Sequence, residues 1–153
     1  MSDNIPYVEK MINVGDIEIG VKAEPFKVLD INQYDDGNLE IVSRMFLSLK
    51  SKNKPVVGRF SEVFYRTYVK IYDENGNDIS NMPRRAYFPS DHFKEEILQP
   101  NGKRELVFLA YAKYLNTNSS KFINVEVIFS NQFNTWTHPF NLKVRVPVNK
   151  NFN

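Results

Sequence analysis

The sequence contains no cysteine, only two histidines and no long uninterrupted hydrophobic run. Without cysteine, neither a disulfide framework nor a thiolate metal site can form. His92 and His138 are far apart in the sequence, so no histidine pair has the spacing of metal ligands. No apolar stretch approaches the roughly 18 residues that a membrane helix needs, and Met1–Lys10 lacks a basic region followed by an apolar run. We therefore expect no signal peptide, no transmembrane segment and no membrane partner.

Signatures of catalysis are also missing. The six glycines are scattered, and no Gly-x-Gly-x-x-Gly or Walker pattern is present to cradle a phosphate. No Gly-x-Ser-x-Gly elbow marks a serine as a nucleophile. Glu95 and Glu96 are sequence neighbours on a predicted helix, where adjacent side chains do not face each other. We predict that the protein is not an enzyme and has no catalytic residue, metal site or cofactor.

The composition is that of a globular protein. The 153 residues suffice for one domain with a real core, and 42% of them are hydrophobic while 25% are charged. Twelve phenylalanines and eight tyrosines, against one tryptophan, suit β-strands and their cross-strand pairs. The formal net charge of +2 is too small to indicate a nucleic-acid partner by itself.

Apolar and polar residues alternate along much of the chain, which is typical of half-buried strands. In the last such segment Leu142, Val144 and Val146 share one face, while Lys143 and Arg145 share the other. The predicted strands are Asp16–Ala23, Phe26–Ile31, Leu39–Leu49, Val63–Tyr72 and Asn141–Val148, with a short edge strand around Arg85–Phe88.

The most hydrophobic stretch of the chain, Glu105–Asn131, predicts a long β-hairpin with the arms Glu105–Leu115 and Phe122–Ser130. The second arm alternates cleanly between apolar and polar residues. The first arm is apolar on both faces, and a strand that is covered on both faces usually lies in the middle of a sheet or sandwich. We therefore expect the rest of the fold to be organised around this hairpin.

One short helix is predicted at Ser90–Gln99, because Ser90 and Asp91 can cap its start and Pro100 and Gly102 end it. About seven strands and one helix predict an all-β fold, a two-sheet antiparallel β-sandwich that is Ig-like or jelly-roll-like, with a closed barrel as the competing architecture. The predicted organisation is a flexible N-terminal arm at residues 1–14, a single β-sandwich domain at 15–149 and a C-terminal tail at 150–153.

The segment Asp73–Asp78 is rich in side-chain oxygens and contains an Asn-Gly pair. A helix-loop-helix calcium site needs glycine at its sixth position and glutamate at its twelfth. Those two positions hold Asp78 and Arg84. Because Asn-Gly between strands is the strongest signal of a tight hairpin turn, we predict a plain turn.

Two proline-bounded loops rich in aromatic residues form the predicted interaction surface, because aromatic residues and arginine are enriched at interfaces. As an alternative, Tyr87, Phe133 and Trp136 are the predicted platform of a carbohydrate- or ligand-binding site. The possible interaction residues are Arg84, Arg85, Tyr87, Phe88, Phe133, Trp136 and His138.

A basic and aromatic face is a further candidate site. Arg66, Tyr68 and Lys70 share the outward face of a predicted strand, and Lys52 and Lys54 form a basic run in the preceding loop. Cations interleaved with aromatic rings are what single-stranded nucleic acid requires. Charged outer faces also serve solubility alone, so nucleic acid is the less favoured partner.

These observations favour a non-enzymatic structural or interaction protein that acts through protein–protein contacts. The concrete hypothesis is a small virus or phage particle component, capsid-decorating or tail-associated, located in the virion or cytoplasm. Its partners would be other protein subunits, in a homo-oligomer or a larger assembly. The polar arm and the Asn-rich tail Asn149–Asn153 motivate this hypothesis, since such segments gain order on binding a neighbour. The alternatives are a carbohydrate- or ligand-binding module and a single-stranded nucleic-acid-binding protein.

Overall fold

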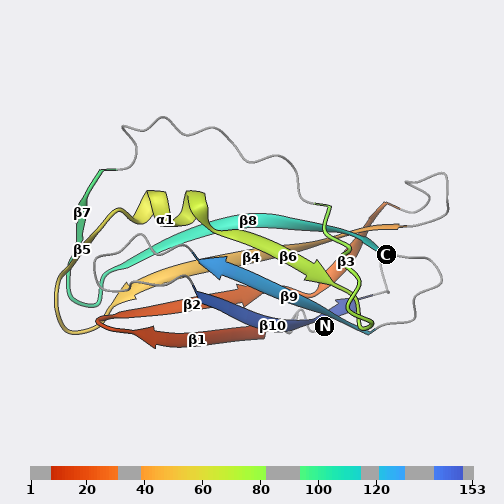
Figure 1. The fold of residues 1–153 in the computed structure, drawn as a ribbon, viewed down its shortest axis with the longest axis horizontal. Coiled ribbons are helices and arrows are strands. Elements are labelled where there is room, and N and C mark those ends of the chain that lie inside the picture. The colour runs from red at the N-terminus through yellow and green to blue at the C-terminus, as the bar shows by residue number, and fades with distance from the viewer. Residues whose placement is uncertain (1–7, 31–38, 82–93, 115–120, 130–139, 150–153) are drawn as a thin grey trace, which may run out of the picture.

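The computed structural model describes residues 8–30, 39–81, 94–114, 121–129 and 140–149. These residues are mostly in β-strands, which confirms the all-β prediction, and Figure 1 shows the long strands running lengthwise with β5 and β7 at one end. Eight strands form one mixed sheet and two form a second, small sheet. The elements are β1 (Val8–Val14), β2 (Ile17–Ala23), β3 (Phe26–Asp30), β4 (Leu39–Ser51), β5 (Val56–Gly58), α1 (Phe60–Arg66), β6 (Tyr68–Tyr72), β7 (Glu96–Leu98), β8 (Lys103–Tyr114), β9 (Phe122–Phe129) and β10 (Phe140–Asn149).

Strand β4 is the longest strand of the large sheet and pairs on both edges. Strand β8 runs antiparallel along one edge, and the other edge is shared by β2 and then β3. The break between β2 and β3 falls at Glu24 and Pro25, because proline restricts the residue before it and carries no N–H for a ladder. The Ser43 hydroxyl donates to the Glu24 carbonyl at 2.6 Å, which satisfies the backbone at this break.

The other part of the large sheet consists of β10, β9 and β6, paired antiparallel in that order. It joins the first part through a short parallel pairing of β10 with β3, in which Val148 lies opposite Phe26. The sheet is therefore mixed, and the prediction that it would be antiparallel throughout is wrong. Beyond β6, Ile79 donates to Ile71 at 2.8 Å and accepts from Lys113 of β8 at 2.9 Å. Hydrogen bonds thus lead from β8 through β4, β3, β10, β9 and β6 back to β8.

The predicted central hairpin is wrong in its pairing. Both of its arms are strands, but β8 pairs with β4 whereas β9 pairs with β10 and β6. Strand β8 is also not covered on both faces by the described residues. Ala110 and Ala112 face the core and are fully buried, while Val107 and Leu109 on the other face are 49% and 47% exposed. The apolar character of this second face requires an explanation other than burial within the described chain.

The helix lies elsewhere than predicted. Strand Val63–Tyr72 was expected, yet its first part belongs to α1, because Phe60, Val63 and Phe64 have the i, i+3, i+4 spacing of one helical face and pack on the core. Thr67 ends the helix, with its hydroxyl donating to the Val63 carbonyl at 2.6 Å. The predicted helix Ser90–Gln99 is wrong over its described part, where β7 pairs with β5.

Strand β1 occupies the second half of the segment 1–14 that we expected to be a flexible arm, and the first half lies outside the described residues. It pairs with β2 over seven residue pairs, from Val8 opposite Ala23 to Val14 opposite Ile17. Val8, Ile12 and Val14 are partly buried against the hydrophobic core. None of the described residues forms a helix that is long and apolar enough to cross a membrane.

Candidate functional site

Strands β6, β9 and β10 present their outward side chains in rows that run across the three strands. One row contains Lys70, Glu126 and Lys143, and the next contains Tyr72, Asn124 and Arg145. Side chains that are directly opposite across a strand pair lie within contact distance, so the two rows form one continuous patch. We call these six residues the polar face.

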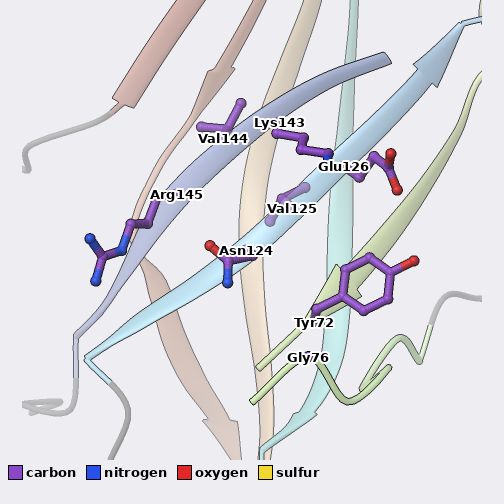
Figure 2. Close-up of a pocket in the computed structure, with 8 residues that line it drawn as sticks. All are labelled: Tyr72, Gly76, Asn124, Val125, Glu126, Lys143, Val144 and Arg145. Carbon is purple, nitrogen blue, oxygen red and sulfur yellow. The ribbon is translucent and has the colours of Figure 1, made fainter. Parts of the chain in front are cut away.

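The polar face contains an open pocket of about 480 Å³. Figure 2 shows Tyr72 and Arg145 at opposite sides of this pocket, with Asn124 between them. Glu126 and Lys143 line it as well, and Gly76 borders it from the turn after β6. Residues with an aromatic ring, an amide and charged groups of both signs therefore line one hollow.

Positive charge predominates on the polar face, with three cations against the single carboxylate of Glu126. That carboxylate accepts a hydrogen bond from the side-chain amide of Asn141. The guanidinium of Arg145 lies 4.3 Å from the centroid of the Phe122 ring, and such stacking favours a fixed orientation of the cation. The Lys10 ammonium donates to the Lys143 carbonyl at 3.2 Å, which brings a further cation to the β10 edge.

The turn beside the polar face is built by Asp73, as predicted for this segment. Its buried carboxylate accepts from the backbone amides of Asn75 and Asn77 at 2.9 Å each and from the Asn77 side chain at 3.1 Å. Gly76 has a φ of +85°, a conformation that glycine adopts without strain. Protein donors therefore occupy this carboxylate, and the described residues contain no group of three or more His, Cys, Asp or Glu that could hold a metal ion.

Asp78, at the end of the same turn, keeps its negative charge near Lys70, the cation of β6. The Ser80 backbone amide donates to its carboxylate at 2.9 Å, and this bond, followed by that of the Ser80 side chain and the charge of Lys70, lowers the pKa of Asp78. Because the folded-state pKa is lowered, ionised Asp78 stabilises the fold above the ordinary pKa of aspartate. That contribution is lost as the pH falls through the folded-state pKa.

A second, apolar patch lies on the outward side of β4 and β8. In this part of the sheet Phe46 lies opposite Val107, and Val42 lies opposite Tyr111. We call Val42, Phe46, Val107, Leu109 and Tyr111 the apolar face. Val107 and Leu109 are about half exposed. Clusters of this kind on a protein surface mark interaction sites more often than isolated apolar residues do.

A hollow and charged side chains adjoin the apolar face, and one of these, Arg44, lies within it, directly opposite Leu109. The Lys22 ammonium lies 4.7 Å and the Arg44 guanidinium carbon 5.5 Å from the centroid of the Phe46 ring. Arg44 also forms an ion pair with Glu24 at 2.7 Å. A pocket of about 280 Å³ opens beside them, lined by Glu24, Pro25, Lys27, Val42, Arg44 and Leu109.

The interaction surface predicted on the two aromatic loops lies outside the described residues. Segments 82–93 and 130–139 contain all of its residues, namely Arg84, Arg85, Tyr87, Phe88, Phe133, Trp136 and His138.

The predicted nucleic-acid residues are only partly brought together. Tyr68 and Lys70 both point outward from β6, in line with the rows of the polar face. Lys52 and Lys54 lie on the β4–β5 connection instead, where the Lys52 ammonium donates to the Gly15 carbonyl at 3.1 Å. Arg66 ends α1, and its side chain is outside the described part.

Comparison with known proteins yields little. No protein-family model matches the chain, and no curated protein sequence matches it. A solved X-ray structure, described as Northeast Structural Genomics Consortium target SoR45, resembles it with a TM-score of 0.48 and 10% sequence identity, over 88% of this chain and 89% of that one. At that TM-score the likeness supports no conclusion about function.

Proposed function

We propose that this protein is a non-enzymatic structural protein whose copies associate through the apolar face. The observation that carries the proposal is the exposure of Val107 and Leu109, at 49% and 47%, on the outward side of β8, which pairs with β4 in the large sheet. Within the described ranges no element covers them. Leaving apolar area in water costs about 25 cal/mol per Å² relative to burial, so covering this face with a partner is favourable.

A second copy of the chain is the partner that the surrounding charges fit best. Lys22, Arg44 and Lys50 lie on the same outward side of the sheet as Glu18, Glu24 and Glu105. In a two-fold dimer the same patch meets itself, so a rim that carries both signs is self-complementary.

The shape of the face agrees with this arrangement. Val107 projects from β8, and the pocket that Pro25 and Val42 line lies on the same side of the sheet. A two-fold axis between these features places each projecting side chain of one copy near the hollow of the other. The polar face on β6, β9 and β10 stays free when the apolar face on β4 and β8 is covered, because the two faces use different strands.

In the wider hypothesis of a virus or phage particle subunit, the apolar face would also be buried by a partner, here further subunits of a shell or tail. Its sequence support is reduced, because Val8–Val14 forms β1 instead of a free arm. The carbohydrate-binding alternative relies on Tyr87, Phe133 and Trp136, which lie outside the described residues.

Crosslinking at a single cysteine tests the proposal directly, because the natural chain has none. Leu109→Cys, treated with a bis-maleimide reagent, should yield a covalent dimer. Thiols that face each other react at an effective concentration in the millimolar range, so dimer formation should be about tenfold or more faster than for a thiol placed elsewhere.

The matched control is Glu74→Cys, at an exposed position of the Asp73 turn. Circular dichroism establishes that both variants are folded before the reaction. If Leu109→Cys crosslinks no faster than Glu74→Cys at equal protein concentration, the apolar face is not where copies meet.

A further inference from the structure

The polar face combines phosphate-binding and stacking groups on one side of β6, β9 and β10. Lys143 and Arg145 are two residues apart on β10, so their side chains leave the same face about 7 Å apart along the strand. Lys70 extends the positive charge to β6, on the far side of β9. Cations on both outer strands thus border the central strand of the face.

Aromatic rings complete this arrangement. The Tyr72 ring lies beside the pocket (Figure 2), and Tyr68, two residues earlier on β6, is 44% exposed on the same side of the strand. Phe122 lies under the Arg145 guanidinium at 4.3 Å. That guanidinium is planar and presents a fork of donors that matches a phosphate. Asn124, in the middle, offers both a donor and an acceptor to a base edge.

We infer that the polar face binds single-stranded nucleic acid, with phosphates held by Lys143 and Arg145 and a base stacked on Tyr72. A sheet surface with exposed rings and cations suits splayed-out bases. The described part of this face carries no helix or projecting ribbon that would enter a duplex groove. Glu126 reduces the positive charge at the centre, which weakens binding of a plain polyanion while leaving base stacking intact.

This site is independent of the proposed self-association, because it uses the opposite set of strands. Crosslinking of Leu109→Cys therefore tests self-association alone, and oligonucleotide binding tests the polar face alone.

Fluorescence anisotropy with labelled oligothymidylate and oligouridylate of about 20 nucleotides is the test, and comparison of the two strands distinguishes DNA from RNA. If Lys70 contacts a phosphate together with Lys143 and Arg145, the three contacts give a slope of log K against log salt of about −2 for a single strand. The affinity should therefore fall roughly 20-fold between about 50 mM and about 200 mM salt.

Two variants separate charge from stacking. Arg145→Gln should make the salt slope shallower by about 0.7, because one phosphate contact is lost. Tyr72→Ala should weaken binding roughly 5-fold to 150-fold with the slope unchanged, since stacking on an aromatic ring contributes about 1–3 kcal/mol per base. The matched control is Lys94→Gln, which removes a charge from an exposed position outside the polar face and should change neither quantity.

Three results would overturn the inference. The first is no binding at the lower salt concentration. The second is an equal loss of oligonucleotide affinity in Lys94→Gln and Arg145→Gln. The third is binding of polyglutamate as tight as that of the oligonucleotides, with Tyr72→Ala having no effect, which would indicate an acidic protein partner instead.

Discussion

Phe26→Ala should lower the free energy of unfolding by about 3–5 kcal/mol, the usual cost of truncating a buried phenylalanine. Phe26 is fully buried and lies opposite Val148 in the short parallel pairing that joins β3 to β10. A cavity at this point removes packing where the two parts of the large sheet meet. Urea unfolding followed by far-UV circular dichroism measures the change.

The neighbouring variant Lys27→Ala is the control, because Lys27 is exposed and surface changes usually stay within about 0.5 kcal/mol. Equal unfolding midpoints for Phe26→Ala and Lys27→Ala would show that the β3–β10 junction does not hold the sheet together.

Ile12→Asp should destabilise the fold by about 3 kcal/mol, because it places a carboxylate against the core. Ile12 lies opposite Ile19 of β2 and is partly buried, whereas Asn13, the next residue, is exposed. Asn13→Asp should therefore leave the thermal midpoint nearly unchanged. The pair of variants distinguishes a strand from an arm, since a free arm at residues 1–14 would tolerate both substitutions equally.

The strands with the clearest alternation could be predicted from the sequence. The segments around Ile19 of β2, Leu47 of β4 and Val144 of β10 have a period of two that one buried face produces. The pairing of β8 with β4 could not be predicted, because it joins segments about 60 residues apart and nothing local encodes the partner. The α1 segment resembles a strand in the sequence because Val63 and Tyr65 of α1 continue the alternation of Val69 and Ile71, which belong to β6.

For the candidate sites, the sequence predicts which residues of a single strand share a face, but not which strands lie side by side. Tyr68 with Lys70, and Lys143 with Arg145, could each be assigned to an outward face from alternation. Their union in the polar face depends on β9 lying between β6 and β10, which the sequence does not reveal. The apolar face did leave a signal, the hydrophobicity of both sides of β8. That signal indicates either an interior strand or an exposed face awaiting a partner, and only the structure distinguishes the two.

The native mass of the protein tests the central claim, self-association through the apolar face, most directly. Light scattering over a concentration series should show the wild-type mass rising from 17.9 kDa towards twice that value. Leu109→Glu, which places a charge in the middle of the face, should remain at 17.9 kDa over the same series. A wild-type protein that stays at the monomer mass at every concentration, or a variant that associates as the wild type does, would contradict the account.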